Sequence, residues 1–310
     1  MKLLQNRVAE SKMALPIMAC YGTLIWLLCG LLTKEWWWQF ACFSVTCYMM
    51  AQLNNIHALI RVYSRMVSCS FIALMCAANF LFPSLEGGVV QVCAIGFLMM
   101  FFATYQDRDA SGRMYYAFLC VGLASLFFPH ILFFLPVLWL FILFNMLSFS
   151  LRTLSASLMG VMTPYWFWMA WLLYQHDFSP LTVHLAQLLE FNEPFNLAGM
   201  GPSRKLYVAL LMVLSLLGTI HFINKKSGDK IRIRLTYAVF MWLNLLSLLF
   251  LLLQPQHCDM LLRLMTICTA PLTGHFIALT RGRITNIVFV LITVVTLMMT
   301  VFNIVFLWMP

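Results

Sequence analysis

The chain has 310 residues, of which 63% are hydrophobic and only 9% are charged. A soluble domain carries roughly 25% charged residues, because its surface must be covered with polar groups. The composition therefore excludes an ordinary soluble fold and indicates a protein whose main solvent is membrane hydrocarbon. The formal net charge is +9. Clustered positive charge can bind nucleic acid, but here it lies at the ends of apolar runs, so no nucleic-acid partner is expected.

Eleven apolar runs are long enough to form helices that cross a bilayer. A spanning helix needs around 20 mostly apolar residues, and only a backbone that satisfies its own hydrogen bonds is stable in lipid. The predicted runs are 14–33, 36–53, 66–83, 89–105, 114–129, 131–147, 154–175, 206–224, 234–254, 260–280 and 285–308. We therefore predict an all-α polytopic transmembrane bundle of about eleven spans, with residues 1–310 in one membrane domain.

The basic residues indicate which side each loop faces. Cytoplasmic loops of membrane proteins are enriched in Lys and Arg. With a cytoplasmic N-terminus, fifteen of the nineteen basic residues fall in cytoplasmic segments, and the other four are Lys34, Arg204, Lys205 and Arg263. This pattern predicts that the N-terminus is cytoplasmic and that the C-terminus lies outside.

Two segments depart from regular spans. The fifth and sixth runs are short and meet at Pro129-His130, with Pro136 beyond. They predict a tight hairpin, which is either re-entrant or an ordinary turn where Pro ends one helix and kinks the next. In the long outer loop, residues 176–205, Ser179-Pro180 is typical of a helix start, and leucines recur at helical spacing. We expect an amphipathic helix on the membrane surface there.

Polar residues at membrane depth are costly, so they are the candidate functional residues. Asp259 and Arg263 lie four residues apart, share a helix face and are expected to pair, with His275 about three turns deeper. A histidine beside a carboxylate can act as a general base, and adjacent cations can bind phosphate. The candidate catalytic residues are His184 and Asp259, and the candidate substrate-binding residues are Arg204, Lys205, Arg263 and His275.

The ten cysteines show neither metal-ligand spacing nor a disulfide framework. Most of them fall inside the apolar runs, where a cysteine packs as a small apolar residue. Neither a metal nor a cofactor is therefore expected.

Residues 50–175 resemble an uncharacterised family of polytopic inner-membrane proteins from Bacteroidota. The shared features are Asn54-Asn55, the span end Leu81-Phe82-Pro83, the segment Gly122 to Phe127 and Pro164 in the seventh run. The resemblance implies a multi-pass protein of the bacterial inner membrane, and that family has no established activity. The short hairpin and outer surface helix are also similar, more faintly, to multi-span glycosyltransferases and polymerases that use polyprenyl-phosphate sugars.

Three functions fit these observations, and whether the protein is an enzyme stays open. The first is envelope glycan or lipid assembly, in which a lipid-linked substrate such as a polyprenyl carrier is handled at the outer face. The second is a transporter or flippase, which predicts broken helices and polar residues in the interior. The third is a non-catalytic scaffold for membrane-protein partners. In every case membrane lipids are expected partners. The interior polar residues that the second function would use are Asn79, His130, Asn145, His221, Asn244 and His275.

Overall fold

The computed structural model describes residues 3–191, 194–195 and 199–308, and it is 82% helical, with no strand among these residues. The all-α prediction is confirmed. The helices are α1 Leu4–Glu10, α2 Ala14–Leu28, α3 Trp37–His57, α4 Met66–Ala77, η1 Asn79–Leu81, α5 Leu85–Phe102, α6 Ser111–Phe127, η2 Pro129–Phe134, α7 Leu135–Phe141, the π-helical η3 Ile142–Met146, α8 Leu151–Gln175, α9 Ser179–Gln187, α10 Pro202–Lys225, η5 Lys226–Gly228, α11 Ile231–Leu253, η6 Pro255–His257, α12 Cys258–Leu279 and α13 Arg283–Trp308.

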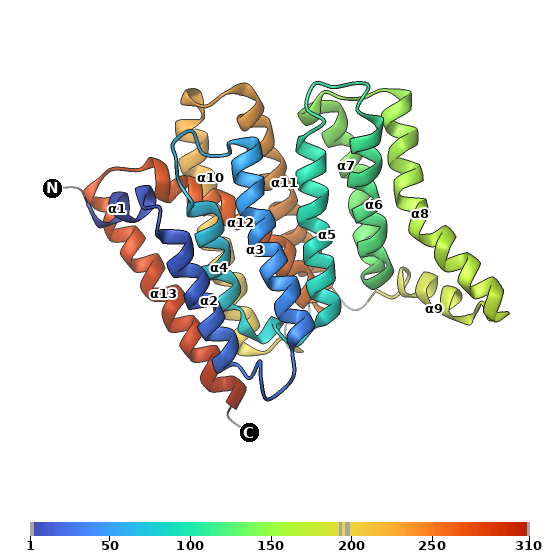
Figure 1. The fold of residues 1–310 in the computed structure, drawn as a ribbon, viewed down its shortest axis with the longest axis horizontal. Coiled ribbons are helices and arrows are strands. Elements are labelled where there is room, and N and C mark those ends of the chain that lie inside the picture. The colour runs from blue at the N-terminus through green and yellow to red at the C-terminus, as the bar shows by residue number, and fades with distance from the viewer. Residues whose placement is uncertain (1–2, 192–193, 196–198, 309–310) are drawn as a thin grey trace.

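The long helices run side by side as a bundle (Figure 1). Each of the eleven predicted runs coincides with a helix or a series of helices. Six helices are long and apolar enough to cross a membrane, and α1 and α2 form a further candidate that is bent by 92°. The protein is therefore a multi-pass membrane protein. The six are Leu85–Phe102, Pro129–Met146, Pro202–Gly228, Ile231–Leu253, Pro255–Leu279 and Arg283–Leu307.

The bundle has two ends, which we name by their contents. At the α9 end lie α9, the starts of α10 and α12 and the end of α13, while at the opposite end lie η5 and the turn between α12 and α13 (Figure 1). The short α9 lies across the direction of the long helices, with Pro180 in its first turn. The helix expected after Ser179 is thus present.

The predicted hairpin is also present, and its second arm is an irregular helix. After α6 ends at Phe127, Pro129–Met146 continues through a 3₁₀ helix, a short α-helix and a π-helix. We call residues 129–146 the broken helix. The amide N–H of Gln106 donates to the Met146 carbonyl oxygen at 2.8 Å. The broken helix therefore returns beside α6 to the loop that precedes that helix.

Helix α12 lies at the centre. In its candidate span 89% of the residues are buried, against 33% in those of α10 and α13, the lowest share among the six candidate spans. It packs against α4, α10 and α11. Gly274 and Gly218 permit this, since an added Cβ would lie 2.8 Å from the Val67 nitrogen and 2.7 Å from the Leu272 Cβ, respectively. Small residues let helices approach closely where lipid surrounds them.

Helix α8 packs on the bundle mainly through α6. Its start is fixed by a capping box between Ser150 and Thr153. At the contact, a Cβ on Gly160 would lie 2.5 Å from the Tyr115 carbonyl oxygen, and one on Gly122 would lie 2.6 Å from the Val161 carbonyl oxygen. The two glycines therefore set how closely α6 and α8 approach.

Replacing Gly160 by Val should destabilise the protein by about 1–3 kcal/mol, because the new side chain collides with backbone that cannot rotate away. Thermal melting of the detergent-purified protein, followed by tryptophan fluorescence, measures this. Gly112→Ala is the control, since nothing lies within 4 Å of an added Cβ there. Equal melting temperatures for G160V and the wild type would contradict the close α6–α8 contact.

Candidate functional site

A polar pocket opens at the α9 end, between the end of α6, the start of the broken helix, α9 and the start of α12. Its volume is about 360 Å³. The polar side chains of its lining include two carboxylates, two imidazoles, two amides and one hydroxyl. They are Glu190, Asp259, His130, His257, Gln187, Gln256 and Ser84.

The two imidazoles form one wall of the polar pocket. The ring centroids of His130 and His257 are 3.9 Å apart, and the edge of Phe128 packs on His257 at 5.4 Å. The side-chain amide of Gln256 lies 3.0 Å from Nε2 of His257 and donates to the Glu190 carbonyl oxygen at 3.2 Å. This network holds His257 in place and joins η6 to the segment after α9. Imidazoles so placed can exchange hydrogen bonds or a proton with a bound polar group.

Asp259 lies at the edge of the polar pocket in an ion pair with Arg204. The guanidinium donates two hydrogen bonds to the carboxylate, at 2.6 Å and 2.8 Å. Arg204 also lies over the Phe80 ring, 5.6 Å from its centroid. Helical spacing had predicted that Asp259 pairs with Arg263. That prediction is wrong, because Arg263 points into the protein interior while Arg204 approaches Asp259 from α10.

Arg263 does not line the polar pocket; it holds together segments next to the pocket, and we call it the clamp for that reason. It is 4% exposed. Its guanidinium donates to the Gln91 side-chain oxygen at 2.8 Å and to the backbone oxygens of Leu81 and Ser84. Gly87 makes room for it, since an added Cβ would lie 2.9 Å from the Arg263 Cζ. Arg263 therefore ties α12 to the turn before α5 and so positions Ser84.

The other sequence-predicted residues lie apart from the polar pocket. His184 packs against Trp168, and its Nε2 lies 3.3 Å from the Tyr165 hydroxyl. Burial lowers the pKa of His184, which favours its neutral form. Gln187, one turn further along α9, is the residue that reaches the pocket. Lys205 is exposed and is not part of the lining.

His275 lies near the opposite end of α12, about 24 Å along the helix axis from Asp259 at 1.5 Å per residue. Its Nε2 is 3.2 Å from an oxygen of Asp229, and both side chains are almost fully buried. Arg61 lies 4.0 Å from the same carboxylate, and the His221 ring is 5.4 Å from that of His275. His275 therefore belongs to a separate cluster. Its members are far apart in the sequence, so the sequence alone did not group them.

An apolar groove lies next to the polar pocket. It lies between the broken helix and α11, and its volume is about 110 Å³. Among the residues that line it are Phe133, Val137 and Phe250. The His130 ring lies 5.9 Å from that of Phe133 and 6.1 Å from that of Phe250. The polar pocket and the apolar groove are thus neighbours, connected through the packing of His130 on two residues of the groove.

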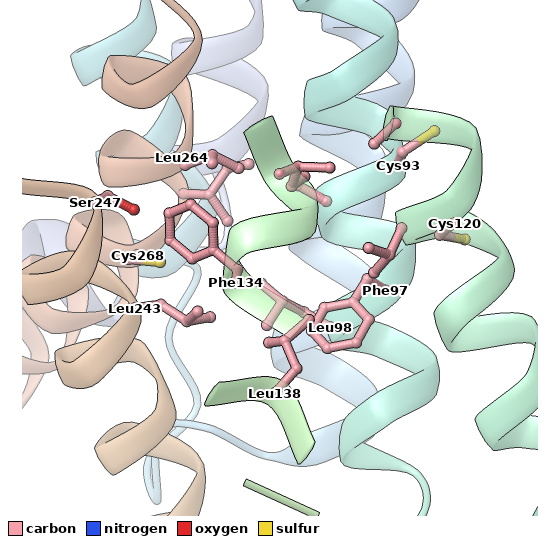
Figure 2. A pocket seen from close by; sticks show the side chains of 15 residues that line it. Cys93, Phe97, Leu98, Cys120, Phe134, Leu138, Leu243, Ser247, Leu264 and Cys268 are labelled. Atoms are coloured by element: carbon pink, nitrogen blue, oxygen red, sulfur yellow. The ribbon is translucent and has the colours of Figure 1, made fainter. Parts of the chain in front are cut away.

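A small interior cavity lies on the other side of the broken helix. Figure 2 shows Phe134 and Leu138 from the broken helix facing Cys93 and Phe97 of α5, Cys120 of α6, and Cys268 of α12. The cavity encloses about 50 Å³, and Ser247 is its one hydroxyl-bearing wall residue. Phe134 borders both this interior cavity and the apolar groove. The broken helix therefore contributes to all three spaces with successive turns.

The chain matches no protein-family model, no curated protein sequence and no solved structure. Within the described residues, no group of three or more His, Cys, Asp or Glu is placed to hold a metal ion. The chemistry of the site therefore follows only from its own geometry. Sequence reasoning named Asp259 and Arg204, and it named Glu190 as a polar residue of the outer loop and His130 as an interior polar residue, but it did not name Ser84.

Removing the Arg263 side chain should destabilise the protein by about 2 kcal/mol or more, because buried oxygens lose a charged hydrogen-bond donor. Removing Arg204 should cost at most about 1 kcal/mol, since its ion pair is 40% exposed and solvent-screened. The melting temperatures of R263A and R204A in the same detergent make the comparison. A larger loss for R204A would show that Arg263 is not the clamp.

Proposed function

We propose that this protein binds a lipid-linked substrate at the outer face of a bacterial inner membrane, as part of envelope glycan or lipid assembly. One observation carries this function: His130, which lines the polar pocket, packs against Phe133 and Phe250 of the apolar groove. An amphiphile with a polar head and a long apolar chain, such as a polyprenyl-phosphate sugar, could place its head in the polar pocket and its chain in the apolar groove. Kinship with the uncharacterised Bacteroidota family, based on residues 50–175, is part of the same proposal.

The polar pocket suits the head of such a substrate. Its volume of about 360 Å³ is within the 300–1,000 Å³ range of small-molecule sites. Glu190 and Asp259 can accept hydrogen bonds from sugar hydroxyls. His130 and His257 can donate to phosphate oxygens. At the rim, the ion pair of Arg204 and Asp259 adds further hydrogen-bonding groups without adding net charge.

The apolar groove suits the chain of the substrate. Lipid tails are as apolar as leucine, so a chain gains little hydrophobic free energy when it moves from the bilayer into a groove. The contacts with Phe133 and Phe250 then act by orienting the chain, and the head supplies most of the selectivity. We assign binding and presentation to this site, with no chemical step.

We further propose that the chain crosses the membrane about eleven times, with a cytoplasmic N-terminus and the α9 end outside. One observation supports the number of spans, and a second supports the orientation. Every predicted span coincides with a helix, and fifteen of the nineteen basic residues fall in the loops assigned to the cytoplasm. The polar pocket would then face the side on which envelope glycans are assembled.

A reporter that is active only after export tests the orientation. Alkaline phosphatase fused after His176 should be active, and the same enzyme fused after Lys226 should be inactive, because α10 lies between the two positions. Reporter activity at Lys226 would reverse the sides and remove the outer-face function. A reporter that is active only in the cytoplasm, fused at both positions, gives the complementary control.

Filling the apolar groove should weaken binding of polyprenyl phosphate. Val137 lines the groove, whereas Leu140 on the same helix is 52% exposed and does not line it. We expect V137W to raise the Kd of the purified protein for undecaprenyl phosphate about tenfold, and L140W to leave it unchanged. Microscale thermophoresis in detergent measures both.

Changing the polar pocket tests the head group separately. The double variant H130A/H257A should lose affinity for the polyprenyl phosphate while its affinity for the matching polyprenol, which has no phosphate, stays the same. His176→Ala, at the exposed end of α8, is the control for histidine loss. If the wild type binds neither lipid, or if all variants bind alike, the proposed substrate class is wrong.

Transport is a second candidate function, because polar side chains follow the central helix α12 through the bundle. Thr266 is 2.7 Å from the Tyr207 hydroxyl, and Thr269 accepts from the Asn244 amide at 2.8 Å. With Arg263 and His275, these side chains place polar groups at several depths, as a flippase would need. Their hydrogen bonds to neighbouring helices equally serve packing.

A further inference from the structure

A second apolar groove lies between α10 and α13, on the opposite side of the bundle from α6 and the broken helix (Figure 1). Its volume is about 470 Å³, and its lining is almost entirely apolar. Leu206, Ala209 and Leu217 of α10 face Val288 and Phe302 of α13 across it. We call it the α10–α13 groove. Because lining residues on both helices are exposed, Leu206 at 52% and Met298 at 67%, this groove faces lipid.

The length of the α10–α13 groove is close to that of one leaflet. Its lining spans eleven residue steps of α10, from Leu206 to Leu217, and fourteen of α13, from Val288 to Phe302, or about 17 Å and about 21 Å at 1.5 Å per residue. Half of a hydrocarbon core that is around 30 Å thick is about 15 Å. Leu206 lies near the start of α10 and Phe302 near the end of α13, so the groove begins at the α9 end. A single acyl chain that enters from that leaflet would fill it.

A positive charge lies just beyond the mouth of the α10–α13 groove. Lys205 precedes the groove-lining Ala209 by four residues, so both occupy one face of α10. Lys205 is exposed and makes no ion pair within the described part of the chain, whereas the neighbouring Arg204 is neutralised by Asp259. No acidic residue lines the groove. Lys205 is thus placed where the head group of a lipid in the groove would lie.

We propose that the α10–α13 groove binds one acyl chain of an anionic phospholipid, and that Lys205 pairs with its phosphate head group. The lipid comes from the leaflet at the α9 end. Apolar packing alone would accept any phospholipid. Lys205 adds a preference for net negative charge, which for one basic residue near a membrane surface corresponds to about fivefold in affinity. This site is separate from the polar pocket and does not depend on the function proposed for it.

The test reconstitutes the purified protein in vesicles of phosphatidylglycerol and phosphatidylcholine in equal amounts. After extraction in a mild detergent, native mass spectrometry counts the phospholipids that stay bound. The wild type should retain phosphatidylglycerol over phosphatidylcholine about fivefold. Lys205→Gln should abolish the preference while keeping a bound lipid, and Lys205→Arg should restore it.

The groove itself is tested by size. Ala209→Phe should remove the tightly held phospholipid, whereas Leu216→Phe, on an exposed face of α10 outside the groove, should not. If A209F elutes as misfolded protein, Val213→Phe takes its place. Retention of the same lipid by A209F and L216F, or an unchanged preference in K205Q, would overturn the assignment. Since V137W blocks only the apolar groove beside the broken helix, it should leave this result unchanged.

Discussion

The whole structure depends on the absence of water around most of its surface. A backbone N–H or C=O without a partner is costly in hydrocarbon, so a chain in lipid must close its hydrogen bonds within helices. The exposed side chains can then be apolar, as Phe167 at 75% and Leu151 at 81% exposure are. Under this constraint, hydrophobic burial no longer distinguishes one helix arrangement from another.

Close helix contacts and buried hydrogen bonds determine which helices pack together, which hydrophobicity alone cannot do. Glycines bring α6 to α8, and α12 to α4 and α10. Buried amides join distant segments: Asn79 donates to the Thr300 carbonyl at 3.1 Å, and Asn303 donates to the Ala77 carbonyl at 2.7 Å. These bonds attach α13 to the end of α4 and to η1 directly after it. Arg263 likewise joins α12 to the turn before α5, but burying its charge costs more free energy than burying an amide.

The candidate site lies where this regular packing is interrupted. Pro129 lacks an N–H and begins a new helix, so His130 stands at the junction between the polar end and the apolar interior. The 3₁₀ and π turns of the broken helix change the direction of successive side chains, which lets one segment border the polar pocket, the apolar groove and the interior cavity. Irregular helices at membrane depth occur where a cavity or a ligand uses them.

The sequence by itself determined the solvent, the helical class, the positions of the helices, the break at Pro129 and the helix that begins at Ser179, because each follows from local composition and periodicity. Only the tertiary structure decided which polar side chains pair with one another. Arg204 lies 55 residues from Asp259, and Asp229 lies 46 residues from His275. Spacing on one helix favoured Arg263 for Asp259, but the Arg263 guanidinium donates instead to oxygens of Gln91, Leu81 and Ser84. Such contacts are set by how several helices pack together, which no single apolar run encodes.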